Sequence, residues 1–154
     1  MTIRQRLSEL ELTFTAPRTP AFNYQAVIED EGLAWVSGQL PWQGDSTDLV
    51  CSGRLGESVD LEGGIACAKA CVLQALSVLE DTLGGLDRIR RVVKVVGFVA
   101  SAPGFNDQPA VIDAASALLI EIFGDAGRHA RSAVGVAELP RGAPVEIELI
   151  VRCD

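Results

Sequence analysis

The sequence predicts an α+β fold, a two-layer sandwich in which two helices cover one face of a mixed β-sheet. Two stretches, residues 60–83 and 107–123, carry apolar side chains at helical spacing. Short runs rich in β-branched and aromatic residues precede, separate and follow them, which gives the order ββ-α-β-α-ββ. Because each helix has one apolar stripe to bury, both are expected to pack on the sheet.

Length and composition indicate one domain with an aliphatic core. A chain of 154 residues is typical of a single domain, so we expect residues 1–154 to form one unit with residues 1–20 as an N-terminal extension. Hydrophobic residues make up 48% of the chain and aromatic residues only 5%. The core should therefore consist mainly of Val, Leu, Ile and Ala.

Charge, hydropathy and cysteine content disfavour a nucleic-acid-binding, membrane-spanning, secreted or metal-binding protein. The net charge is −8 and the pI about 4.6, which disfavours a nucleic-acid partner because such proteins carry a basic face. No apolar run reaches the roughly 18 residues of a membrane span, and residues 1–6 lead into no apolar segment typical of a signal peptide. We therefore expect a cytoplasmic protein with free thiols. Four cysteines and one histidine offer no good zinc set, so no metal is expected.

Local signals define the expected elements. Residues 1–12 have the pattern of a short amphipathic helix, and strands over residues 24–29 and 33–38 flank a hairpin turn. Asp60 is suited to cap the first long helix, and Asn106 or Asp107 the second. Between the helices, a β-branched run over residues 91–100 predicts a buried strand.

The last two predicted strands carry the residues with the clearest chemistry. Residues 131–137 and 143–152 are expected to form a hairpin, with Arg131 opening its first strand and Glu146 and Glu148 inside its second. The parallel N–H donors of an arginine match two carboxylate oxygens, and a glutamate can orient water or move a proton. The alternative for Arg131 is an edge-strand arginine paired with a surface carboxylate. The alternative for the two glutamates is a second strand whose carboxylates face solvent.

Three motifs resemble those of the RidA/YjgF family, in the right order over residues 24–151. The first is Ser-Gly-Gln-Leu-Pro at residues 37–41, the second Arg-Ser-Ala-Val-Gly-Val-Ala-Glu-Leu-Pro at 131–140, and the third Val-Glu-Ile-Glu at 145–148. The resemblance implies a chorismate-mutase-like fold that assembles as a homotrimer with sites between subunits. It also implies hydrolysis of reactive 2-imino acids and their enamine tautomers to 2-keto acids and ammonia, with no cofactor.

The resemblance further implies roles for individual residues. Arg131 would bind the substrate carboxylate, helped by the backbone N–H of Gly38, and Glu146 would act on water at the active site. Tyr24 matches the pocket tyrosine of the family, although a lone tyrosine on a strand is often a packing residue.

This chain departs from the family pattern at two positions. Ala133 stands where many members have cysteine, and Asp113 aligns best with a pocket asparagine. An acid at position 113 would repel an anionic substrate unless it is paired. The only histidine, His129, has no mechanistic role in this scheme, and we expect it to be structural.

Other functions are compatible with parts of this sequence. The same arginine would serve a non-catalytic binder of small carboxylates such as 2-keto acids. A ribonuclease or translation inhibitor has also been attached to the family, but no basic stripe is visible in this sequence. A chorismate mutase would need several cations around a dianion, and only one well-placed arginine is evident.

Overall fold

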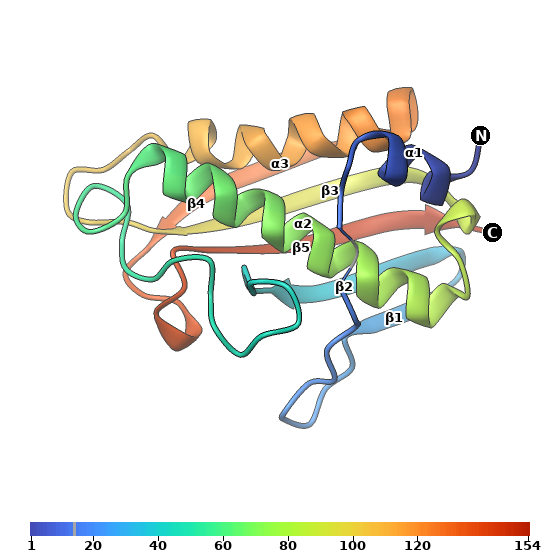
Figure 1. The fold of residues 1–154 in the computed structure, drawn as a ribbon, viewed down its shortest axis with the longest axis horizontal. Helices are drawn as coiled ribbons and strands as arrows, with labels where there is room; N and C mark the ends of the chain where they lie inside the picture. Colours follow the sequence, from blue (N-terminus) through green and yellow to red (C-terminus); the bar gives the residue numbers. More distant parts are fainter. Residues whose placement is uncertain (14) are drawn as a thin grey trace.

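The structure, a computed structural model, describes residues 1–13 and 15–154 and confirms the predicted α+β class and order of elements (Figure 1). The helices are α1 (Ile3–Glu9), α2 (Leu61–Leu83) and α3 (Gln108–Phe123). The strands are β1 (Val27–Asp30), β2 (Leu33–Gln39), β3 (Ile89–Ala100), β4 (Ala130–Val136) and β5 (Val145–Cys153). Short 3₁₀ turns follow α2, α3 and β4.

The five strands form one mixed sheet in the order β1-β2-β5-β3-β4. Strands β3 and β4 run parallel, and every other neighbouring pair is antiparallel. Helices α2 and α3 contact each other and cross the same face of this sheet, as Figure 1 shows. We call this side the helix face and the other side the open face.

One topological prediction was wrong, because the last two strands do not form a hairpin. Strand β4 pairs with β3 at the sheet edge, while β5 lies between β2 and β3. A parallel pair needs a crossover connection, and α3 provides it between β3 and β4. The residues of each strand fit its position in the sheet. Strand β5 consists largely of buried aliphatic residues, whereas β4 consists mainly of small residues that are partly exposed, as an edge strand can be.

The predicted helix cap at Asp60 is confirmed, whereas the one at Asn106 or Asp107 is not. Asp60 accepts a hydrogen bond from the Gly63 N–H at 2.8 Å and begins α2, which ends at Gly84. Asp107 precedes α3, but its side chain makes no capping hydrogen bond. In the turn between β1 and β2, Glu31 and Gly32 both have positive φ, 49° and 77°, which is the geometry that a two-residue hairpin requires.

The core lies between the sheet and the helices. In β5 and in the second half of β3, alternate residues point to the helix face and are fully buried, among them Val95, Val99, Val145, Ile147 and Leu149. The residues between them point to the open face and are only partly buried. Three large apolar side chains, one on each of β1, β2 and β4, are strongly exposed, namely Ile28, Trp35 and Val134. No element of the described chain covers that side of the sheet.

Helix α2 is long and apolar. By length and composition it is apolar enough to cross a membrane. In the structure it packs on the sheet as a core helix, and more than half of its most apolar stretch is buried inside the fold.

Candidate active site

Three of the predicted site residues come together in one cavity. Gly38, Tyr24 and Glu146 line a cavity of about 750 Å³ between the ends of β2 and β5 and the segment before β1. The sequence predicted a strand over residues 24–29, but Tyr24 does not lie on it, because β1 begins at Val27. It lies in an irregular segment that precedes β1, and its side chain is half-exposed.

The carboxyl group of Glu146 lies directly against the backbone of Gly38. A Cβ atom at position 38 would lie 1.9 Å from Oε1 of Glu146, so a larger residue there would displace this carboxyl group. Gly38 also lies in a β-bulge, because three steps along β2 from Val36 to Gln39 match two steps along β5. Bulges are frequent next to active sites, since they interrupt the ladder and redirect backbone groups.

The surroundings of Glu146 favour its protonated form. Burial raises the pKa of this carboxyl group, and the negative charge of Glu148 raises it further. A carboxylate with a raised pKa is a stronger base than one in water and holds a proton more readily. Glu146 therefore has the properties of a group that takes a proton from water and gives it back.

Arg131 lies elsewhere, on the helix face of the edge strand β4. Its guanidinium Nη1 donates to Ser116 Oγ at 3.2 Å and lies 3.4 Å from Asp113 Oδ1, both on α3. The Asp113 carboxylate is thus paired, although it is 76% exposed. The repulsion expected from an acid at position 113 is therefore reduced. Ala133 lies on the same face of β4 and packs against the core.

The single histidine supports Arg131 through a chain of hydrogen bonds. His129 Nδ1 lies 2.6 Å from the Gly127 carbonyl oxygen, which can only accept, so Nδ1 carries the proton. In the neutral ring Nε2 then accepts from the Ser116 hydroxyl at 2.9 Å, and Ser116 accepts in turn from Arg131. This agrees with the structural role expected of His129, and it also holds the guanidinium in place.

Within one chain, Arg131 and Glu146 cannot act on the same small molecule. Arg131 aligns with Val95 and, across β3, with Leu149, whereas Glu146 aligns with Phe98. With strands about 4.8 Å apart and about 3.3 Å per residue, the two Cα atoms lie on the order of 14 Å apart. Their side chains also point to opposite faces of the sheet. The structure thus divides the predicted site into two halves.

The cavity beside Glu146 contains two arginines that the sequence did not single out. Arg18 and Arg141 line it together with Trp42, and their Cζ atoms lie 4.3 Å and 5.6 Å from the centroid of the Trp42 ring. These three residues are far apart in sequence and share no motif. The two arginines are recognised as a pair only because both contact the Trp42 ring, and this contact exists only in the folded chain.

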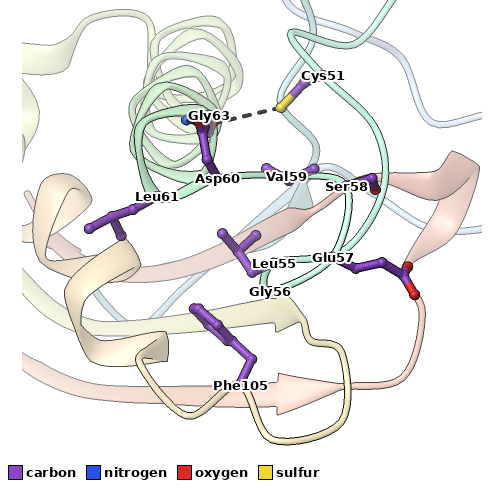
Figure 2. Close-up of a pocket in the computed structure, with 10 residues that line it drawn as sticks. All are labelled: Cys51, Leu55, Gly56, Glu57, Ser58, Val59, Asp60, Leu61, Gly63 and Phe105. Carbon is purple, nitrogen blue, oxygen red and sulfur yellow. Dashed lines mark hydrogen bonds between the residues drawn. The ribbon is translucent and has the colours of Figure 1, made fainter.

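A second cavity, of about 540 Å³, lies beside the start of α2 and contains none of the predicted site residues (Figure 2). Leu55 and Phe105 form its apolar wall, and Cys51 lines it while directing its thiol towards the Gly63 carbonyl oxygen. The Cys51 Sγ atom also lies 3.1 Å from that of buried Cys67, a contact not anticipated from the sequence. Among the described residues, no group of three or more His, Cys, Asp or Glu side chains could hold a metal ion.

Comparison with known proteins places the chain in a family. The family model described as endoribonuclease L-PSP, that of the YjgF/RidA proteins, matches residues 14–153. The chain belongs to this family. Protein TCP17 of Trypanosoma cruzi is 42% identical over 150 residues, which cover 97% of this chain and 92% of that protein. A 2-iminobutanoate/2-iminopropanoate deaminase of Dermatophagoides farinae is 48% identical over 132 residues, or 86% of this chain and 87% of that one.

Solved structures of similar proteins share the fold. Protein Atu1372 of Agrobacterium tumefaciens, whose function is unknown, superposes with a TM-score of 0.90 at 42% identity, covering 99% of this chain and 94% of that one. The YjgF gene product of Escherichia coli superposes with a TM-score of 0.65 at 22% identity, covering 91% and 94% of the two chains. The second likeness concerns the fold alone.

Proposed function

We propose that this YjgF/RidA protein is a cytosolic enzyme that hydrolyses reactive 2-imino acids to 2-keto acids and ammonia. The proposal includes a homotrimer whose sites lie between subunits. Each site would combine Arg131 of one subunit with Gly38, Tyr24 and Glu146 of its neighbour. The named relative from Dermatophagoides farinae, a deaminase of 2-imino acids, supports this choice of reaction.

The observation that carries the proposal is the division of the site within one chain. A carboxylate receptor and a base with a raised pKa lie on opposite faces of the sheet, too far apart for one small substrate. A second copy of the chain can bring them together. The open face offers the apolar surface for such a contact, with Ile28, Trp35 and Val134 between 42% and 51% exposed.

The chemistry follows from these groups. The Arg131 guanidinium and the backbone N–H of Gly38 hold the substrate carboxylate, which places the imine carbon beside Glu146. Glu146 takes a proton from water while the water oxygen bonds to the imine carbon, and it passes this proton to the imine nitrogen. In the resulting carbinolamine, Glu146 takes the hydroxyl proton and gives it to the nitrogen, the C–N bond breaks, and ammonia leaves as the C=O bond of the keto acid forms. One water is consumed for each ammonia released.

Mixed assemblies of two inactive variants test this arrangement. Arg131→Ala and Glu146→Gln would each abolish or severely reduce turnover of 2-iminopropanoate generated in situ. If the site lies between subunits of a closed ring, about a quarter of the sites in a randomly mixed oligomer regain both residues. Activity should then reappear on co-expression of the two variants. Co-expression of Arg131→Ala with the double variant is the matched control, because no site can regain the arginine.

Two results would reject this model. One is a monomer at micromolar concentration in sedimentation equilibrium, and the other is a mixed oligomer as inactive as its parents. A monomer that turns over 2-iminopropanoate would keep the activity but move the site into one chain.

A binder of small carboxylates without catalysis is the second candidate, because Arg131 serves it equally well. It predicts that Glu146→Gln leaves keto-acid binding intact and that the wild type releases no keto acid faster than the buffer does. The family model that matches the chain is that of endoribonuclease L-PSP, which suggests RNA cleavage as another activity. A net charge of −8 disfavours binding of a polyanion, so RNA cleavage is the less favoured reading.

A further inference from the structure

The cavity beside Glu146 differs in charge from the rest of the chain. Acidic residues outnumber basic ones by 21 to 13 overall. Among the residues that line this cavity, the guanidinium groups of Arg18 and Arg141 outnumber the single carboxylate of Glu146. A local excess of positive charge in an acidic protein attracts anions.

The two arginines are held in different ways. Arg18 stacks on Trp42 and donates to the carbonyl oxygens of Gly44, at 3.3 Å, and Ser46. Its hydrogen-bonding capacity is thus partly used by the loop. Arg141 stacks on the same ring from a longer distance, and it has no hydrogen bond or ion pair to any residue that the structure describes.

The backbone at Arg141 indicates that its side chain is not there to stabilise the turn. Its φ of 61° and ψ of 17° lie in the left-handed region, which glycine adopts at lower cost than any residue with a Cβ atom. The side chain lines the cavity and remains exposed. Its five N–H donors are therefore available to a ligand bound beside Glu146.

We infer that Arg141, with Arg18 beside it, forms a second anion subsite, and that the preferred substrates are 2-imino acids with a carboxylate in the side chain. The inference rests on the proposed function for the position of the reacting carbon. With the first carboxylate held by Arg131 and Gly38, the imine carbon faces Glu146 and the side chain extends into the cavity. A carboxylate at its end then meets the Arg141 guanidinium, a pairing that is typically bidentate.

Calorimetry with two keto acids tests the subsite in the complete oligomer. We expect the wild type to bind 2-oxoglutarate at least about tenfold more tightly than pyruvate, as expected of one added charge-assisted contact. In Arg141→Gly this ratio should fall to about one, and Arg141→Lys should retain part of it. The glycine suits the left-handed backbone, so misfolding cannot account for the loss. Arg54→Ala, an arginine outside the cavity paired with Glu57, is the matched control and should keep the wild-type ratio.

The possible outcomes separate this inference from the proposed function. Equal affinities in the wild type, no binding of either acid, or an equal loss of both affinities in Arg141→Gly would overturn the second subsite. If 2-iminopropanoate is hydrolysed but the ratio is about one, the subsite alone fails. If no imine is hydrolysed but the ratio depends on Arg141, the subsite stands and the deaminase proposal fails.

Discussion

The carboxyl group of Glu146 occupies the space that a side chain at position 38 would need. A Cβ atom there would approach Oε1 of Glu146 to 1.9 Å and the carboxyl carbon to 2.8 Å. The atoms in question belong to the end of a flexible side chain, so they can move aside. Gly38 therefore determines where the Glu146 carboxylate lies.

Gly38→Ala should displace this carboxylate and slow turnover with little effect on folding. A displacement of about 1 Å can reduce the rate of a positioned reaction by about a hundredfold. Gly97→Ala is the contrasting variant, because its Cβ would lie 2.4–2.9 Å from three atoms of buried Ile112. Overpacking of this kind costs about 1–3 kcal/mol, so Gly97→Ala should lower the melting temperature. Circular dichroism melts and the keto-acid release assay distinguish the effects of the two variants. A Gly38→Ala enzyme with full activity would show that turnover does not depend on the position of the Glu146 carboxylate.

Glu146→Gln should lower the rate of imine hydrolysis by roughly 10²–10⁴-fold, because the amide cannot accept the proton of water. Affinity for pyruvate should be equal or slightly better, since one negative charge near the anion is lost. Glu121→Gln is the control, because this carboxylate is exposed on α3 and does not line the cavity beside Glu146. Steady-state turnover and calorimetry on both variants provide the comparison. Normal turnover by Glu146→Gln would refute the mechanism.

The raised pKa of Glu146 also predicts how stability depends on pH. The folded protein holds this proton to a higher pH than the unfolded chain does, where the ordinary value is 4.5. As pH rises past that value, the unfolded state ionises first and Glu146 increasingly destabilises the fold. Glu146→Gln should therefore melt above the wild type near pH 7, and the difference should vanish as the pH falls to about 4. Melts of the exposed variant Glu121→Gln should lack this trend, and a gap that widens towards acid would reverse the sign of our argument.

Arg131→Ala should remove both keto-acid binding and turnover. The lost charged contact is worth about 2–5 kcal/mol in a desolvated site. Arg131→Lys should restore little, because a single ammonium group cannot reproduce the planar fork. Arg128→Ala removes a neighbouring, more exposed arginine paired with Asp125, and it should bind pyruvate normally. Titration calorimetry decides the matter, and retention of pyruvate binding by Arg131→Ala would place the site elsewhere.

Cys67 and Cys71 should resist alkylation in the native protein. Burial raises the pKa of Cys67 to about 12, with the neighbouring Cys51 adding to the shift, and burial raises the pKa of Cys71 well above its usual value. The reactive thiolate is thus scarce at neutral pH. Mass spectrometry after brief treatment with iodoacetamide should find both unmodified, whereas all four cysteines should react in denaturant. Rapid native labelling of either residue would contradict the burial argument.

Local patterns in the sequence predicted the elements well because local interactions determine them. Asp60 caps α2 through the neighbouring Gly63 N–H, and strict alternation along β5 places Glu146 and Glu148 opposite the buried Val145 and Ile147. The pairing of strands depends instead on contacts between distant segments. A Pro/Gly turn at residues 140–142 is compatible with a hairpin, and only the aliphatic content of β5 compared with β4 favoured a central position for it.

The site was predicted in part for the same reason. Motifs identified Gly38 and Glu146, which the structure brings into contact. They could not reveal that Arg131 is held by Ser116 of α3, or that Arg18 and Arg141 meet at Trp42, because those partners come from segments far apart in the chain. Alternation along a strand does assign a face to each residue. Which residues of different strands share one face of the sheet depends on the order and register of the strands, and these follow only from the structure.

The central position of β5 has a consequence for how the chain folds. The β1–β2 hairpin and the β3-α3-β4 unit share no ladder with each other, and only β5 pairs with both. During synthesis these two units appear on the ribosome before the strand that joins them, each with unpaired backbone groups along one edge. Closure of the sheet must then await a long-range insertion, which makes folding slow relative to helix formation and leaves open edges for a chaperone to protect.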